Sequence, residues 1–422
     1  MHSTVWSLAA IIAGTFMLQG GNGLLGTFLS LRLALEGTPS FLIGIVVASY
    51  SAGFLVTCLF GHRLIRGVGH IRAFAVCGAL MCCVTLAFAL KVDPFVWAAL
   101  RLLTGAAAAG MFMIGESWLN DRTPSSIRGR IFAIYSLSNM TAQSSCQLLL
   151  FVADPAGLAF FMITAGLFSA CLIPVALTRS SAPTLPSIEA FGLRQLFRIS
   201  PVAVVGCICA GLVNAAVGGL APVFALGVGL GSAEVGLFTA ALVLGGMLLQ
   251  WPLGRLSDRY DRRWVLLGVA VTAGTVALTL AALAGGPVLG LVALAMAFGG
   301  SAYSVYPLCA SHANDHADRK HAVGVSSGLL LSWAIGSIVG PLIATTSMGV
   351  FGPSGLFFYT ASISLPLALY VGWRMTRRAA VPAEQRGAFV AAASAVAPSA
   401  QSPATPVAGE PDPRSNPEGT KS

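Results

Sequence analysis

The chain has 422 residues, of which 56% are hydrophobic and 9% are charged, and its formal net charge is +9. A soluble domain carries roughly 25% charged residues, so this composition excludes an ordinary soluble fold. The basic residues are scattered over many short polar gaps and form no single stripe, which argues against a nucleic-acid partner.

Twelve apolar stretches follow one another along the chain, and most are close to the roughly 20 residues that a membrane-spanning helix needs. They lie near 5–31, 41–60, 73–91, 95–119, 131–152, 157–178, 201–226, 233–253, 264–284, 287–310, 323–346 and 353–373. The sequence therefore predicts an all-α membrane protein with twelve transmembrane helices.

Basic residues gather in alternate gaps between these stretches. The six clusters are Arg63, Arg66 and Arg72; Arg122, Arg128 and Arg130; Arg179, Arg194 and Arg198; Arg255, Arg259, Arg262 and Arg263; Arg319 and Lys320; and Arg374, Arg377 and Arg378. The remaining gaps offer only Arg32 and Lys91. Because Lys and Arg in short loops stay on the cytoplasmic side, we expect these clusters and both termini to be cytoplasmic.

The two halves of the chain resemble each other. Asn22, Gly44 and Gly53 recur 192 positions later, and Gly105, Asn120 and Asp121 recur 194 positions later. The counterparts are, in order, Asn214, Gly236, Gly245, Gly299, Asn314 and Asp315. A six-helix unit used twice in the same orientation places a solute site between the halves, near the bilayer midplane.

The longest polar interruption, at 179–200, divides the predicted helices six and six. We expect one six-helix bundle at 1–178, a cytoplasmic linker at 179–200 and a second bundle at 201–378. Residues 379–422 are rich in Ala, Pro, Ser and Gly, a composition that cannot form a packed core. This segment is expected to be a disordered cytoplasmic tail.

Two charged residues lie inside the fourth stretch. A guanidinium within a span costs at least about 2.5 kcal/mol, so Arg101 should face a cavity or a partner, unless it reaches outward to the headgroups. Glu116 follows 15 residues later, about 22 Å along a helix, which is too far for one salt bridge. Glu116 is either a proton acceptor that senses opening and closing of the cavity or the partner of a loop arginine such as Arg130.

The fifth stretch is unusually polar for a membrane span. Asn139, Gln143 and Gln147 recur every four residues and therefore share one helix face. Unsatisfied amides in hydrocarbon are costly, so this face should line a wet cavity or bond to another helix.

Further cavity candidates come from both halves of the chain. Asn22 and Asn214 occupy equivalent places in the repeat. The rings of Tyr303, Tyr306 and Trp333 can stack on an organic solute, although packing or anchoring at the membrane interface explains such aromatic residues equally well.

The gap after the eighth stretch reads Gly254-Arg-Leu-Ser-Asp-Arg-Tyr-Asp-Arg-Arg263. It resembles the signature G-x-L-[AS]-D-[RK]-x-G-R-[RK] of the major facilitator superfamily. The resemblance implies a cytoplasmic gating role for Gly254, Asp258, Arg259, Arg262 and Arg263. Asp261 stands where the family usually has Gly, and the first-half counterpart at 61–72 has no Asp at all. The alternative is a basic cytoplasmic loop with a solvated carboxylate.

Other motifs extend this resemblance toward the YcaD-type branch of bacterial major facilitator transporters. They are Gln250-Trp-Pro-Leu-Gly254, Gly115-Glu-Ser-Trp118 and the small-residue helix face from Gly336 to Gly340-Pro341. Arg101-Leu-Leu-Thr-Gly105 resembles an element whose Arg is linked to proton movement in proton-coupled members. The resemblance implies the major facilitator fold, with two pseudo-symmetric six-helix bundles in the bacterial inner (plasma) membrane.

We therefore expect a secondary active transporter that moves a small organic solute by alternating access, with proton coupling. The predicted spans contain several amide side chains and few charged ones, which favours a neutral or weakly charged solute. The alternative is a transporter-like membrane sensor or scaffold that binds a ligand without net transport. We predict a monomer in the lipid bilayer with a small-molecule substrate and protons as partners, and no enzymatic activity, cofactor or metal site.

Overall fold

The computed structural model describes residues 2–124, 127–177, 193–317 and 322–377, and every regular element within them is a helix. The predicted tail at 379–422 and most of the predicted linker at 179–200 lie outside the described residues. The helices are α1 (His2–Leu35), α2 (Ser40–Val68), α3 (His70–Phe88), α4 (Pro94–Arg122), α5 (Arg128–Gln147), the 3-10 turn η2 (Leu148–Phe151), α6 (Ala159–Ala170), α7 (Leu172–Ala176), α8 (Leu193–Ile199), α9 (Pro201–Gly227), α10 (Ser232–Arg259), α11 (Arg262–Ala282), α12 (Val288–Ala302), α13 (Val305–His316), α14 (Ala322–Phe351) and α15 (Gly355–Arg377).

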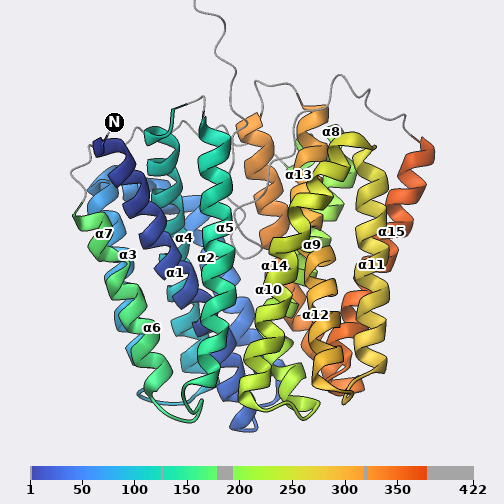
Figure 1. Ribbon diagram of the computed structural model, residues 1–422, viewed down its shortest axis with the longest axis horizontal. Coiled ribbons are helices and arrows are strands. Elements are labelled where there is room, and N and C mark those ends of the chain that lie inside the picture. Colours follow the sequence, from blue (N-terminus) through green and yellow to red (C-terminus); the bar gives the residue numbers. More distant parts are fainter. Residues whose placement is uncertain (1, 125–126, 178–192, 318–321, 378–422) are drawn as a thin grey trace, which may run out of the picture.

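The helices stand in two groups side by side, α1–α7 in one and α9–α15 in the other (Figure 1). The start of α1 and the end of α15 lie at the same end of the molecule (Figure 1). The predicted stretch 287–310 is broken at Tyr303 and Ser304 into α12 and α13. Tyr303 at this break is buried and lines a cavity between the groups.

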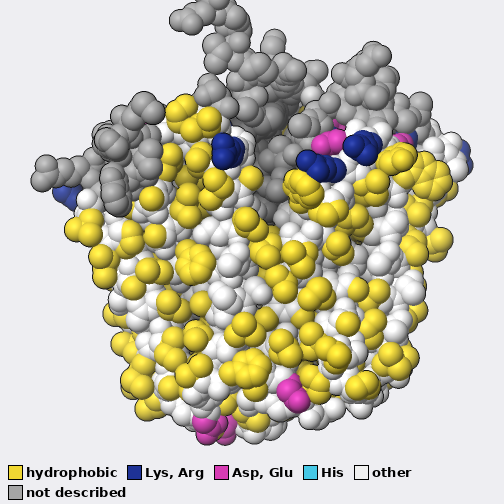
Figure 2. All heavy atoms as spheres, viewed as in Figure 1, with side chains coloured by type: hydrophobic (Ala, Val, Ile, Leu, Met, Phe, Trp, Pro, Cys, Tyr) yellow, Lys and Arg dark blue, Asp and Glu magenta, His cyan; other side chains and the backbone are white. Residues whose placement is uncertain are grey.

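Eleven segments within the described residues are long and apolar enough to cross a membrane, from Leu8–Leu35 to Gly355–Arg377. The expected count of twelve is therefore not reproduced in full, because α5 is too polar to qualify. This helix nevertheless packs lengthwise between α1 and α10. Apolar side chains cover the flank of the molecule, and charged side chains gather at its ends (Figure 2). The chain is a multi-pass, all-α membrane protein.

Glycines at equivalent places in the two groups allow equivalent helix crossings. A Cβ atom at Gly53 or Gly105 would collide with main-chain carbonyl oxygens where α2 crosses α4. The same collision would occur at Gly245 and Gly299, where α10 crosses α12. Small residues let membrane helices approach closely, so the repeated glycines serve one packing function in both halves. The expected close-packing face of α14 is also confirmed, because Gly336 lies against the backbone of α9.

The two groups meet closely where α2 and α10 begin. A Cβ atom at Gly44 of α2 would lie 3.0 Å from the carbonyl oxygen of Pro341 in α14. At the equivalent place in the other half, a Cβ atom at Gly236 of α10 would lie 2.6 Å from the carbonyl oxygen of Gln147 in α5. These paired contacts, together with the packing of α1 on α9, close this end of the interface between the groups.

Candidate functional site

A cavity lies between the two helix groups, at the level of the middle of α1. Helices α1, α2, α4 and α5 contribute to its wall on one side, and α9, α10, α14 and the break between α12 and α13 contribute on the other. The part of the cavity that is open to the centres of water molecules measures about 90 Å³, so the cavity has room for several waters. Seven of the predicted residues line this cavity: Asn22, Arg101, Gln143, Gln147, Asn214, Tyr303 and Trp333.

The repeat continues into the cavity wall. Asn22 and Gly26 of α1 line it from one side, and their counterparts Asn214 and Gly218 of α9 line it from the other. Tyr50 of α2 likewise faces the cavity from the place that corresponds to a leucine of α10. The cavity is therefore built from equivalent segments of both halves, as the internal repeat predicts.

The polar side chains of the first group form a connected set. The Nδ2 atom of Asn22 donates to the hydroxyl oxygen of Tyr50 over 2.7 Å. The guanidinium carbon of Arg101 lies 4.4 Å from the centre of the Tyr50 ring, so the ring face supplies a cation–π contact. The Nε2 atom of Gln147 donates to the carbonyl oxygen of Gly23 over 3.3 Å. These contacts hold the cavity-lining amides and the guanidinium in place between α1, α2, α4 and α5.

Several buried polar atoms at the cavity have no hydrogen-bond partner. They include Oδ1 of Asn22, Nη1 of Arg101, Oε1 of Gln147 and both polar atoms of the Asn214 amide. A buried polar group without a partner is costly, so such atoms need water or a ligand. A polar solute in the cavity can therefore form hydrogen bonds with both walls at once.

Sequence reasoning missed Tyr50, which contacts two of the predicted cavity residues. The available signal was the repeat itself, since position 50 is Tyr and its counterpart 192 residues later is Leu242. Where two equivalent helices carry different residues at one position, the two walls of the cavity present different side chains.

Three predicted residues do not line the cavity. Asn139 is buried one helical turn before Gln143, on the same face of α5 but beyond the cavity wall. Tyr306 is buried in α13 and packs in the core of the second group. Glu116 is half-buried near the end of α4, where its Oε1 atom lies 3.5 Å from the hydroxyl of Tyr135 in α5.

The surroundings of Glu116 come from both helix groups. Besides Tyr135, the thiol of Cys58 in α2 and the phenol of Tyr306 in α13 lie within electrostatic reach of its carboxylate. Arg101, in contrast, faces the cavity, so the structure keeps Arg101 and Glu116 apart as their spacing requires. Glu116 thus lies at the junction of the two groups, beside the cavity rather than in it.

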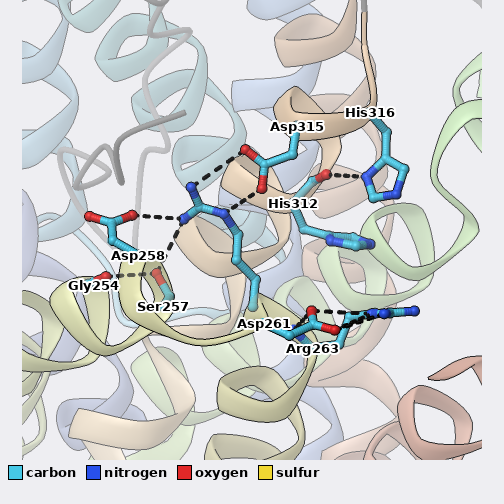
Figure 3. Close-up of polar contacts among 9 residues, drawn as sticks. Gly254, Ser257, Asp258, Asp261, Arg263, His312, Asp315 and His316 are labelled. Atoms are coloured by element: carbon cyan, nitrogen blue, oxygen red, sulfur yellow. Dashed lines mark hydrogen bonds and ion pairs between the residues drawn. The ribbon is translucent and has the colours of Figure 1, made fainter. Parts of the chain in front are cut away.

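A second polar cluster joins three helix ends of the second group (Figure 3). Arg262 at the start of α11 donates from Nε to Oδ2 of Asp315 in α13 over 2.6 Å. Its Nη1 atom lies 3.3 Å from Oδ1 of Asp258 and 3.2 Å from the hydroxyl of Ser257, both in α10. The Arg262 and Asp315 side chains are only 2% and 4% exposed. This Arg262 cluster ties α10, α11 and α13 together within the second group.

Asp261, which stands where the signature usually has glycine, stabilises the start of α11. Asp261 caps α11, since its Oδ1 atom accepts a hydrogen bond from the backbone N–H of Arg263 over 3.0 Å. Its Oδ2 atom also lies 2.7 Å from Nη2 of Arg263. Partial burial acts to raise the pKa of Asp261, but the hydrogen bonds and positive charge of Arg263 outweigh it and leave that pKa below its ordinary value. Arg259 is exposed at the end of α10, and Gly254 accepts a hydrogen bond from Ser257.

The first group has different chemistry at the matching helix ends. Ile65 is buried at the place that corresponds to Asp258, so the first group has no carboxylate there. Asp121, the counterpart of Asp315, is exposed and lies 4.0 Å from Arg122. His70, the counterpart of Arg263, is buried beside the ring of Trp118.

Comparisons with known proteins agree with this architecture. The sequence profile of the Major Facilitator Superfamily matches residues 11–233 and 203–408. YcaD of Salmonella enteritidis PT4, described as an MFS-type transporter, is 28% identical over 359 residues, which cover 84% of this chain and 92% of YcaD. YcaD of Salmonella typhi matches with the same identity and coverage.

Solved structures with low sequence identity share the fold. A variant of the nucleoside transporter NupG superposes with a TM-score of 0.72 at 13% identity, covering 87% of this chain and 99% of that one. A bacterial homologue of the human lysosomal transporter Spinster, in an inward-facing and unoccupied conformation, gives 0.69 at 13% identity, covering 91% and 98%. A D-xylose-proton symporter gives 0.64 at 14% identity, covering 86% and 96%.

Proposed function

The chain belongs to the major facilitator superfamily, and we propose that it is a secondary active transporter that moves a small organic solute through the central cavity by alternating access. The observation that carries this proposal is the set of unpartnered buried polar atoms that faces the cavity from both helix groups. A solute that satisfies atoms on both walls draws the groups together. Rocking of one group against the other then exposes the same site to alternate sides of the membrane.

The moving bodies in this proposal are the bundles 1–178 and 201–378, joined by the linker 179–200. The end that carries the start of α1 and the end of α15 faces the cytoplasm, because the Lys and Arg clusters flank the helices there. The proposed location is the bacterial inner membrane, with both termini in the cytoplasm, and the bacterial relatives support it. This orientation also places the Arg262 cluster on the cytoplasmic side.

The Arg262 cluster acts in this scheme as one half of the cytoplasmic gate. Its ion pairs hold the ends of α10, α11 and α13 as a rigid unit, so the second bundle moves as one piece. Asp258 belongs to this cluster, and Arg259 and Arg263 add positive charge at the same end. The first bundle offers apolar Ile65 at the matching place, which makes the gate unequal.

We further propose that Glu116 carries the coupling proton. Its neighbours Tyr135, Cys58 and Tyr306 come from α5, α2 and α13, so relative movement of the bundles changes the surroundings of its carboxylate. Because Glu116 lies outside the cavity wall, its protonation can respond to bundle movement without contact with the solute. Replacing it by Gln should abolish accumulation driven by a pH gradient while solute exchange without a gradient continues. If Glu116→Gln accumulates solute as the wild type does, this proton route is wrong.

Flux through proteoliposomes tests the transport proposal. The purified protein is reconstituted and offered radiolabelled nucleosides, pentoses, small carboxylates and the amides of those acids, under pH gradients of both signs. We expect saturable, gradient-driven movement of at least one of these probes. A sensor or scaffold would bind a probe, seen as a shift in thermal stability, and move none.

A matched pair of glycine variants tests whether the cavity is the route. A Cβ atom at Gly218 of the cavity wall, or at Gly268 on the outer face of α11, would meet nothing within 4 Å. Both Gly→Leu variants should therefore fold. We expect Gly218→Leu to abolish flux by filling the cavity and Gly268→Leu to keep it. Equal flux in the two variants would place the route elsewhere.

A further inference from the structure

One side of the cavity carries a positive charge that nothing in its wall neutralises. Arg101 is 7% exposed and its Nη1 atom has no hydrogen-bond partner. Among the described residues that line the cavity there is no Asp or Glu. The ring face of Tyr50, 4.4 Å from the guanidinium carbon, is an electrostatic contact but not a counter-ion.

A buried guanidinium without a counter-ion is costly, and a carboxylate relieves that cost best. The planar guanidinium fork matches a carboxylate in two parallel hydrogen bonds. Gly26 keeps the α1 side of the guanidinium free of a side chain, since a Cβ atom there would already contact Nη2 of Arg101 at 3.7 Å. The Arg262 side chain shows the alternative arrangement, in which the protein itself supplies two carboxylates.

The opposite wall has no charged side chain among the described residues that line it. The repeat places Leu242 and Ala295 in the second half where Tyr50 and Arg101 stand in the first. Asn214 therefore has no hydroxyl to bond to, unlike its counterpart Asn22, and both polar atoms of its amide are unpartnered. A ligand that spans the cavity would meet one cation on one side and a free amide on the other.

From this arrangement we infer that the solute is a small organic anion, whose single carboxylate binds Arg101 and whose uncharged polar part binds Asn214. The inference rests on the proposed function, since it names the solute class of the same cavity. The cavity has room for several water molecules, which suits a small solute. One unneutralised arginine implies one negative charge, which refines the expectation of a neutral or weakly charged solute.

Matched pairs of acids and amides test the charge directly. Small monocarboxylates with a second, uncharged polar group, with lactate, 4-hydroxybutyrate and nicotinate among them, are each compared with their own primary amide for thermal stabilisation of the full-length protein and for flux. We expect at least one acid to bind about tenfold or more tightly than its amide, because a charge-assisted pair is lost in the amide. Arg101→Gln should remove that preference, and Arg101→Lys should keep it at lower affinity.

The stability of the ligand-free protein provides a test that needs no solute. Arg101→Gln removes an uncompensated charge, so the variant should unfold at the same temperature as the wild type or higher. Arg262→Gln, which removes a buried arginine from two carboxylates, should unfold at a lower temperature. A clear loss of thermal stability in Arg101→Gln would overturn the inference by making Arg101 a structural residue.

The outcomes separate this inference from the transport proposal. If amides or other neutral probes are carried as well as the acids, or if Arg101→Gln keeps the preference for acids, the anion inference is wrong while transport stands. If acids bind through Arg101 but none moves, the anion inference stands and transport is wrong. If no acid of the panel stabilises the wild type, the inference is wrong for solutes that this cavity admits.

Discussion

Arg101 and Arg262 are both buried arginines, one in each helix group, and they differ in what surrounds them. Arg262 has two carboxylates and a hydroxyl within 3.3 Å, supplied by α10 and α13. Arg101 contacts the ring face of Tyr50 and otherwise faces the cavity. A buried ion pair that is complete stabilises the arrangement of the helices that supply it. A buried charge for which the protein supplies no counter-ion indicates a place where a ligand can supply one. The comparison thus distinguishes a structural cluster from a binding site in the same molecule.

The largest effect is expected from breaking the complete cluster. Arg262→Gln leaves Asp315 buried without its cation, which costs about 3–5 kcal/mol of unfolding free energy when one partner of a buried pair is removed. Thermal unfolding of the purified protein measures the change. Arg259→Gln is the matched control, because Arg259 is exposed on the same segment and a surface substitution stays within about 0.5 kcal/mol. Equal stability in both variants would show that the cluster does not hold the helix ends.

A smaller effect should follow from making the two cavity walls alike. Tyr50→Phe removes the hydroxyl that binds Asn22, which costs about 1 kcal/mol of stability. Leu242→Tyr places a hydroxyl near Asn214 at the equivalent position and offers its free amide a partner. We expect solute affinity to fall in both variants, as measured by the ligand-induced shift in unfolding temperature. An unchanged affinity in Leu242→Tyr would mean that Asn214 does not bind the solute.

The cap of α11 should contribute about 1 kcal/mol. Asp261→Ala and Asp261→Gly both remove the ion pair with Arg263 and the acceptor for its backbone N–H. Because Gly is tolerated at a cap position and Ala is not, Asp261→Ala should be less stable than Asp261→Gly by up to about 1 kcal/mol. Unfolding temperatures of the two variants measure the difference. A larger loss for Gly than for Ala would assign the role of Asp261 to something other than the cap.

The smallest effect is a dependence of stability on pH. Because the pKa of Asp261 is lower in the folded protein than in the unfolded chain, its ionised form stabilises the fold. That contribution is complete above the unfolded pKa, near 3.9, and is lost as the pH falls through the lower folded value. The gap in stability between the wild type and Asp261→Asn should therefore shrink below about pH 4. A gap that is constant between pH 6 and pH 3 would contradict this assignment.

The cavity could be predicted in part from the sequence. Seven of its lining residues were identified as polar or aromatic side chains within predicted spans, and the repeat indicated that both halves contribute. Asn139 and Gln143 lie on one face of α5, yet only Gln143 reaches the cavity. Periodicity specifies a face, but the depth at which that face opens onto a cavity depends on the neighbouring helices.

The partners of the charged residues could not be predicted in the same way. Arg262 pairs with Asp315, which lies 53 positions later in the chain. The signature drew attention to Asp258 instead, which forms the longer and more exposed contact at 3.3 Å. The spacing of Arg101 and Glu116 excluded a mutual salt bridge, and the structure places the two apart, but the approach of Tyr50 to Arg101 depends on the crossing of α2 with α4.

The sequence by itself determined the membrane fold, the order of the helices and the duplication. These follow from hydropathy, from the positions of Lys and Arg and from repeated residues, all of which act locally along the chain. Only the tertiary structure decided which polar groups are satisfied and which are not. Such pairing depends on how each helix is rotated and how closely it crosses its neighbours, and Gly53, Gly105, Gly245 and Gly299 set those distances.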